Sequence, residues 1–114
     1  MLSIERLEEY GADVKIGLER CMNSEDFYFR MISMFPNEDC FNRLEEAIGK
    51  NDLDAAFEAA HALKGVAGNL SLAPLYKDAE EITELLRSRT QMDYSELLEK
   101  IRNHREIIRK MVED

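Results

Sequence analysis

A histidine, a lysine one turn later and two glycines share one helical stretch of this sequence. The stretch reads Ala60-His61-Ala62-Leu63-Lys64-Gly65-Val66-Ala67-Gly68-Asn69-Leu70. Each glycine in a helix interior costs about 1 kcal/mol relative to alanine, so helix stability does not account for the pair. An imidazole nitrogen is a nucleophile near neutral pH, and a nearby ammonium group stabilises an anion. The combination indicates an exposed nucleophile beside which another molecule needs room.

The helical period predicts that His61 lies on the outside of this stretch. At about 100° per residue, the apolar residues form one stripe that faces a core. The stripe consists of Leu53, Ala56, Ala60, Leu63, Ala67 and Leu70, widened by Ala59 and Val66. His61 points roughly 130° away from the middle of that stripe by the same angular count.

The neighbours of the imidazole follow from the same geometry. Phe57 and Lys64 lie on the flank between the histidine and the apolar stripe, and Glu58 and Gly65 lie on the far flank. Gly68 follows one turn further along. We therefore expect both glycines to leave the space beside the imidazole open.

Ordinary structural roles are the alternative interpretation of each residue. A helical histidine is commonly a surface residue, glycines let helices pack closely, and lysines cover exposed helix faces. Here the two glycines lie on the histidine side rather than in the apolar stripe. This shared face favours a functional site.

The segment resembles the histidine-containing phosphotransfer (HPt) domains of bacterial and eukaryotic phosphorelays. The motif of that family reads approximately His-x-Leu-Lys-Gly-x-x-x-x-Leu-Gly. Here it reads His61-Ala62-Leu63-Lys64-Gly65, then Leu70, with Ser71 in place of the final glycine. Upstream, Tyr10-Gly11-Ala12-Asp13-Val14 and Gly17-Leu18-Glu19-Arg20-Cys21 are similar to the amino-terminal helix of many such domains.

The resemblance implies a role for each residue of the motif. His61 would be the phosphoacceptor through Nε2, Lys64 would stabilise the phosphate, and Gly65 would let a partner approach. Phe57, Glu58 and Gly68 would contact that partner. The implied partners are receiver domains of response regulators, with a hybrid sensor histidine kinase as a further one. The receiver would hold the Mg²⁺, so we expect no cofactor and no metal on this chain.

Two other functions remain open. The chain could be a helical adaptor that binds receivers without being phosphorylated, or an HPt module cut from a hybrid sensor or chemotaxis kinase. The presence of His61, Lys64 and Gly65 together argues against the unphosphorylated adaptor. Met1, and an end shortly after the last apolar turn, favour a free-standing protein.

Other catalytic signatures do not occur in the sequence. It contains no glycine-rich phosphate loop, no His-Glu-x-x-His and no Ser/His/Asp pattern. We therefore expect a phosphocarrier without kinase activity of its own. His104 lacks the family context, and we interpret it as a partly buried structural histidine.

Composition limits the class of protein and its partners. The chain has 114 residues, of which 45% are hydrophobic, and only two prolines and five glycines. One small all-α domain fits these values. A net charge of −9 with no basic run argues against nucleic acid. The absence of a long apolar run or a secretory signal, and of metal or redox spacing at Cys21 and Cys40, favours a cytoplasmic protein with reduced thiols. We expect no membrane contact and a monomer.

The predicted fold is all-α: an antiparallel four-helix bundle with short additional N-terminal helices, in a single domain over residues 1–114. Residues 1–36 would form the N-terminal helices, and residues 37–114 the bundle with the phosphoacceptor hairpin. Predicted helix starts are Ser3, Asp13, Ser24, Asp52 and Pro74, with Asp93 and Glu96 as a capping box.

Apolar spacing predicts which side of each helix faces the core. Phe27, Met31 and Met34 would face it before Pro36 interrupts that helix. Later seams are Phe41, Leu44, Ala47 and Ile48; Leu75, Ala79, Ile82 and Leu86; and Leu97, Ile101, Ile108 and Met111. We interpret the methionines at 22, 31, 34, 92 and 111 mainly as gap-filling core residues.

Overall fold

The computed structural model describes residues 1–113, and every regular element in that part of the chain is helical. The elements are α1 (Ile4–Tyr10), α2 (Val14–Arg20), α3 (Glu25–Met34), a 3-10 turn (Phe35–Asn37), α4 (Asp39–Gly49), α5 (Leu53–Asn69), α6 (Ala73–Arg87) and α7 (Ser95–Glu113). The predicted all-α class is confirmed. None of these helices is long and apolar enough to cross a membrane.

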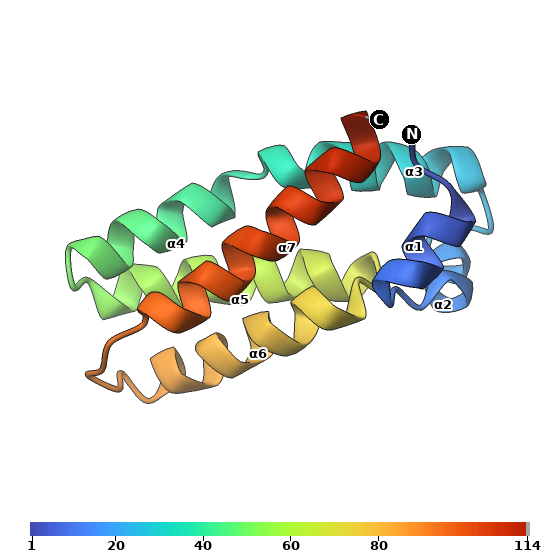
Figure 1. The fold of residues 1–114 in the computed structure, drawn as a ribbon. Coiled ribbons are helices and arrows are strands. Elements are labelled where there is room, and N and C mark those ends of the chain that lie inside the picture. Colours follow the sequence, from blue (N-terminus) through green and yellow to red (C-terminus); the bar gives the residue numbers. More distant parts are fainter. Residues whose placement is uncertain (114) are drawn as a thin grey trace.

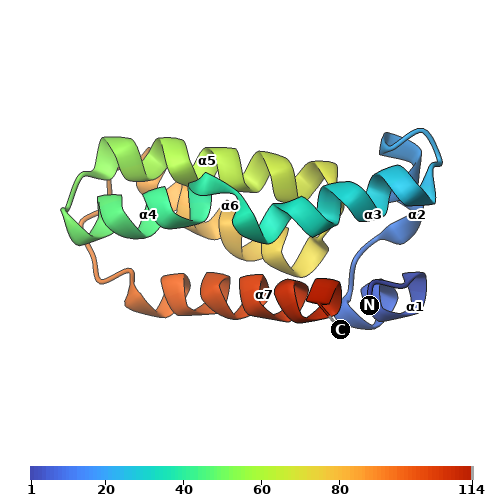
Figure 2. The ribbon, with the colours of Figure 1, turned by 90° about the horizontal axis from the view of Figure 1, so that it is seen from above.

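Four long helical segments form an antiparallel bundle (Figure 1). α5 packs against both α4 and α6, and α7 packs against α6 and against α3 with the 3-10 turn. Figure 2 shows α3 and α4 following one another in nearly one line, so that together they supply one edge of the bundle. The short N-terminal helices α1 and α2, which the sequence predicts, lie at one end of the bundle.

Alanines let α5 occupy the middle of the bundle. Its seam residues Ala56, Ala60, Leu63 and Ala67 are all fully buried, as predicted. Small side chains allow a helix to approach two neighbours closely, which suits a helix packed against α4 and α6 at once. The opposite side of α5 remains at the surface, and His61 lies there.

Side-chain caps set most helix starts where the sequence predicted them. Ser3, Asp13, Ser24 and Asp52 each accept a hydrogen bond from a backbone N–H in the first turn of the helix that follows. Pro74 lies in the first turn of α6. The capping box at Asp93 is wrong, because its carboxylate accepts the N–H and Oγ–H of Ser95 at 2.9 and 2.5 Å instead of the Glu96 N–H.

The predicted core face of α3 is also wrong. Tyr28 and Ile32 are fully buried, whereas Met34 is 53% exposed and Phe27 and Met31 are only half-buried. The buried residues lie one position along the chain from the predicted ones, so the helix is rotated by about 100°. The other predicted seams of the bundle are buried, apart from the half-buried Ile48 on α4 and Leu53 and Val66 on α5.

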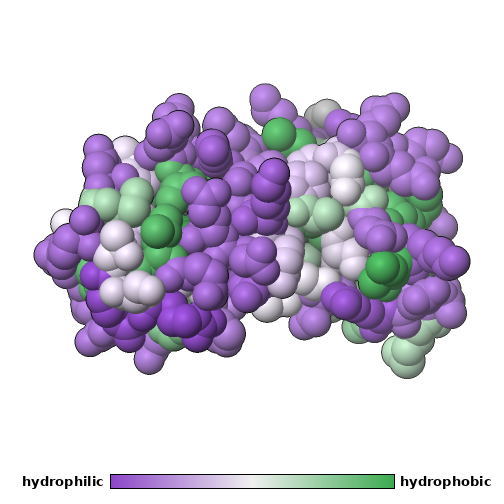
Figure 3. All heavy atoms as spheres, turned by 90° about the horizontal axis from the view of Figure 1, so that it is seen from below, coloured by the Kyte–Doolittle hydropathy of each residue, from purple (hydrophilic) through white to green (hydrophobic). Residues whose placement is uncertain are grey.

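Most methionines do not fill the core. Met22, Met34 and Met92 are exposed and Met31 is half-buried, so that only Met111 of the five is buried. Figure 3 shows the face over α6, where hydrophilic side chains predominate and apolar ones gather in separate areas.

The N-terminal helices are fastened to the end of α5. The Tyr28 hydroxyl on α3 donates to the Leu70 carbonyl at 2.8 Å, and the Asp13 N–H donates to the Ser71 carbonyl at 2.9 Å. Gly17 on α2 makes room for this arrangement, because a Cβ there would lie 2.5 Å from the Tyr28 hydroxyl oxygen. These contacts bring α2 beside the exposed face of α5.

Candidate functional site

His61 lies near the middle of α5 with its side chain at the surface. The Asp52 cap and the buried alanine and leucine seam fix the start and the rotation of this helix. Because a helix presents successive residues about 100° apart, burial of Ala60 and Leu63 forces the imidazole outward. The predicted exposed position of the histidine is confirmed.

Phe57 packs against the imidazole from the preceding turn. The two ring centroids lie 5.9 Å apart, and the ring planes are inclined by 20°, which is a stacked arrangement. The Arg87 and Arg89 guanidinium groups lie 5.0 and 4.9 Å from the Phe57 ring centroid. Cations over an aromatic face are attracted by its quadrupole, so these arginines hold the ring beside His61.

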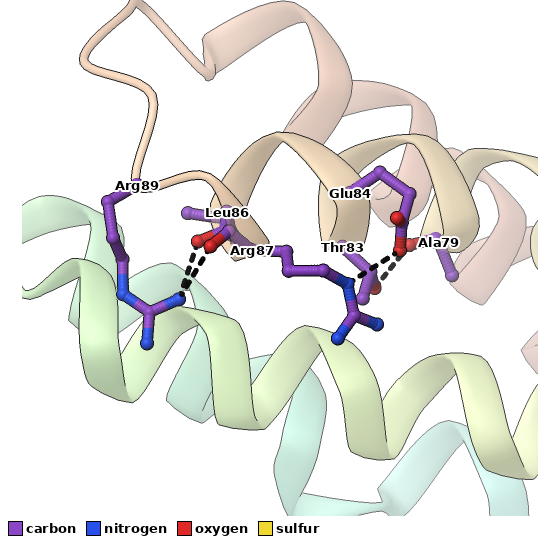
Figure 4. A network of polar contacts seen from close by, with 6 residues as sticks. All are labelled: Ala79, Thr83, Glu84, Leu86, Arg87 and Arg89. Carbon is purple, nitrogen blue, oxygen red and sulfur yellow. Dashed lines mark hydrogen bonds and ion pairs between the residues drawn. The ribbon is translucent and has the colours of Figure 1, made fainter.

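The arginines reach α5 from the end of α6 (Figure 4). The Arg89 side chain donates to the Leu86 carbonyl and to Asp54, in both cases at 2.7 Å. Arg87 pairs with Glu84 at 3.1 Å. Arg89 thus caps α6 and neutralises Asp54 on α5.

Lys64 lies one turn after the histidine. Its side chain is half-buried, and its Nζ lies 6.0 Å from the centroid of the Tyr76 ring on α6. The apolar stem of a lysine commonly lies along neighbouring side chains while the ammonium group stays in water. The ammonium group is therefore positioned on the same face as the imidazole.

The two glycines differ in what surrounds them. A Cβ at Gly65 would meet nothing within 4 Å, so the surface beside His61 is open there. A Cβ at Gly68 would lie 3.1 Å from Tyr76 Cε1. The expectation that both glycines leave open space therefore holds for Gly65 only, because the Tyr76 ring fills the space at Gly68.

One shallow depression includes the central residues of the predicted site. It is lined by Arg20, His61, Lys64, Gly65, Gly68, Asn69 and Tyr76. No carboxylate is among these lining residues, although the chain has 24 acidic residues against 15 basic ones. The depression is thus suited to an anion.

Glu58 lies apart from this depression. It is exposed and lines a separate groove between α4 and α5, with Arg43 and Lys50. Contact of a partner with Phe57, Glu58 or Gly68 stays a prediction.

Arg20 and Tyr76 belong to the depression but were not identified as site residues from the sequence. Arg20 comes from α2, and its guanidinium donates to the Gly68 carbonyl on α5. Tyr76 comes from α6. No local spacing connects either residue with His61, and Arg20 is separated from it by some 40 positions.

His104 has the structural role that the sequence predicted. Its Nδ1 lies 2.8 Å from the Tyr10 hydroxyl oxygen, and its Nε2 lies 2.9 Å from Asp78 Oδ2. The side chain is 18% exposed. It links α7 to α1 and α6, so His61 is the histidine with a solvent-facing ring.

The remaining metal-binding residue types do not form a cluster. Among residues 1–113, no group of three histidines, cysteines or acidic residues is placed to hold a metal ion. Cys21 and Cys40 are buried free thiols, and burial raises the pKa of Cys40.

Comparison with known proteins gives one match. The family model described as the Hpt domain matches residues 36–114, which is more than half of the chain. The match includes α4 to α7 and begins after α1, α2 and α3. Neither a curated protein nor a solved structure matches the chain.

Proposed function

Because this chain belongs to the Hpt domain family, we propose that it is a histidine phosphotransfer protein of a phosphorelay. His61 accepts a phosphoryl group from the aspartyl phosphate of a receiver domain and passes it to another receiver. The observation that carries this proposal is the exposed imidazole in a depression that contains cations and no carboxylate.

The proposed transfer is a displacement at phosphorus. The lone pair of an imidazole nitrogen, Nε2 by family resemblance, forms a bond to phosphorus. The bond from phosphorus to the aspartate oxygen breaks, and the carboxylate leaves with its electron pair. The imidazole then releases a proton to water. Transfer to a second receiver reverses these steps on a new carboxylate.

Positioning and charge neutralisation dominate phosphoryl transfer, so this chain needs few groups of its own. Phe57 stacks on the ring and limits its orientation. Lys64 supplies positive charge one turn away, and open space at Gly65 lets the receiver bring its phosphoryl group to the nitrogen. We expect Mg²⁺ on the receiver, where it neutralises charge on the phosphoryl oxygens.

A two-receiver experiment tests this proposal. One receiver domain is charged with labelled acetyl phosphate and Mg²⁺, separated from the reagent and mixed with the protein. A second receiver is added later. The proposal predicts that label moves to the protein and then to the second receiver.

The adaptor function predicts a different result. Wild-type protein that binds several charged receivers but never acquires label would contradict phosphotransfer and support an unphosphorylated adaptor. The presence of His61, Lys64 and Gly65 on one face favours phosphotransfer, since an adaptor has no need of all three.

A further inference from the structure

Arg20 is the one residue lining the His61 depression that lies outside the matched family segment. It is the last residue of α2, and its side chain is at the surface. The contacts of Tyr28 with Leu70 and of Asp13 with Ser71 hold the N-terminal helices against the end of α5. The position of Arg20 therefore depends on the packing of the whole N-terminal segment.

The guanidinium group is held in place by one backbone acceptor. An Arg20 Nη1–H donates to the carbonyl of Gly68, two turns after His61 on the same helix. A guanidinium has five N–H donors, and this bond uses one of them. Among residues 1–113, Arg20 makes no ion pair with a carboxylate.

Five other arginines of the molecule have a carboxylate partner, whereas Arg105 donates to the Pro36 carbonyl and to Asn42 Oδ1. Arg43, Arg87, Arg89, Arg102 and Arg109 each pair with an acidic side chain. Arg20 has no carboxylate partner and lines the His61 depression, which contains no carboxylate, as well as a neighbouring depression that includes Asp13. Its charge remains available to an anion.

We propose that Arg20 binds the phosphoryl group of phosphorylated His61, together with Lys64. This inference rests on the proposed function and adds a residue to that site. The two cations approach from different elements, Lys64 from α5 and Arg20 from α2. Phosphorylation adds negative charge to a neutral ring, and a planar guanidinium suits oxygens of a phosphoryl group better than a single ammonium does.

A small donor tests Arg20 without a receiver. Phosphoramidate labels histidine directly: the ring nitrogen forms the new bond to phosphorus, the donor nitrogen leaves as ammonia, and the ring loses a proton. Four proteins are labelled in parallel: wild type, Arg20→Gln, Arg20→Lys and Lys15→Gln. Lys15 is an exposed cation on the same helix that does not line the depression, so it is a matched control for net charge.

We expect Arg20→Gln to lower the labelling rate about fivefold, as loss of one charge-assisted contact does. Arg20→Lys should recover part of the rate, and Lys15→Gln should label like wild type. Thermal unfolding of each variant identifies any loss due to structure alone. If the role of Arg20 is purely structural, Arg20→Lys should not recover the labelling rate when its thermal stability equals that of Arg20→Gln.

Two results would overturn the inference in distinguishable ways. In the first, wild type is labelled at His61 and Arg20→Gln is labelled as fast as Lys15→Gln. This result would refute the role of Arg20 and leave the proposed function intact. Wild type that is labelled neither by phosphoramidate nor by any receiver would refute both.

Discussion

At the scale of single residues, the site is built by side chains that hold one another in place. Phe57 stacks on the imidazole and is itself covered by Arg87 and Arg89. Lys64 lies toward Tyr76 on the neighbouring helix. The His61 imidazole is therefore exposed but has a supported ring, and its surroundings supply positive charge. Positioned groups of this kind suit the phosphoryl transfer that we propose for this site.

Replacement of Lys64 tests the charge of the site. Lys64→Ala should slow phosphoryl transfer to His61 about tenfold, because one charge-assisted contact to the phosphoryl group is lost. The half-buried side chain carries little of the core, so thermal unfolding should change only slightly. Transfer rates and unfolding curves of the two proteins provide the comparison. A stability loss as large as the activity loss would refute the assignment.

Replacement of Gly65 tests whether a partner needs the open surface. Gly65→Ala meets nothing within 4 Å and removes a helix-interior glycine, so the free energy of unfolding should rise by up to about 1 kcal/mol. Transfer from a charged receiver should slow, whereas labelling by phosphoramidate should stay unchanged. Equal transfer rates from the receiver for variant and wild type would contradict the clearance role.

At the scale of helices, local sequence signals predict where a helix begins better than they predict which of its faces is buried. Ser3, Asp13, Ser24 and Asp52 cap helices within four residues of themselves, so the sequence predicts these starts correctly. Along α3 and the 3-10 turn that follows it, two adjacent apolar stripes share the same spacing. Phe27, Met31 and Met34 form one, and Tyr28, Ile32 and Phe35 form the other. Periodicity cannot choose between them, and packing decides.

In the site, too, the sequence predicts local features but not contacts between distant segments. His61, Lys64 and Gly65 lie within two turns of one helix, so their shared face follows from the sequence alone. Arg20 reaches the face only because the N-terminal helices pack on the end of α5, and Tyr76 reaches it through packing of α6. These are contacts between segments distant in sequence, which spacing rules do not cover.

The turn after α5 gives a test at this scale. Ser71 replaces the final glycine of the family motif and has a backbone φ of 55°, in the left-handed region that favours glycine. Ser71→Gly should raise the free energy of unfolding by about 0.5 kcal/mol, the relief of strain less the added freedom of the unfolded chain. Urea unfolding measures the change.

The control for that change is Ser71→Ala, which removes the hydroxyl and keeps the strained backbone. It should be no more stable than wild type. If Ser71→Ala and Ser71→Gly stabilise equally, the hydroxyl and not the backbone conformation explains the effect.

At the scale of the whole molecule, the N-terminal helices and the bundle form one unit. The buried Tyr28 hydroxyl donates to Leu70, and the Tyr10 hydroxyl contacts His104 on α7. The N-terminal segment is thereby tied to the turn between α5 and α6 and to the last helix. Because this segment carries Arg20, its docking and the charge of the site are linked.

Alkaline pH should weaken that docking. Burial raises the pKa of Tyr28 to about 12, with Cys21 and Asp13 adding to the effect, from an ordinary value of 10.0. Between these values the unfolded chain loses the tyrosine proton while the folded chain keeps it, so stability falls as pH rises. The free energy of unfolding should be unaffected by this group below pH 10 and should decline between pH 10 and 12.

Tyr28→Phe isolates this contribution. The variant should lose about 1 kcal/mol at neutral pH, because the Leu70 carbonyl loses its buried donor. Its stability should also fall less steeply above pH 10 than that of wild type. Some decline should remain, since burial raises the pKa of Tyr10 as well. If the free energy of unfolding falls equally steeply above pH 10 in wild type and Tyr28→Phe, the assignment to Tyr28 is contradicted.

The most direct test of the central claim is to locate the phosphoryl group. Wild type and His61→Gln are each mixed with a receiver domain charged with acetyl phosphate and Mg²⁺, and ³¹P NMR and peptide mass mapping at neutral pH follow the product. The account predicts one phosphoramidate signal, located on the His61 imidazole and absent from His61→Gln, with both proteins equally folded. A signal that persists in His61→Gln, or phosphate on His104, would contradict it.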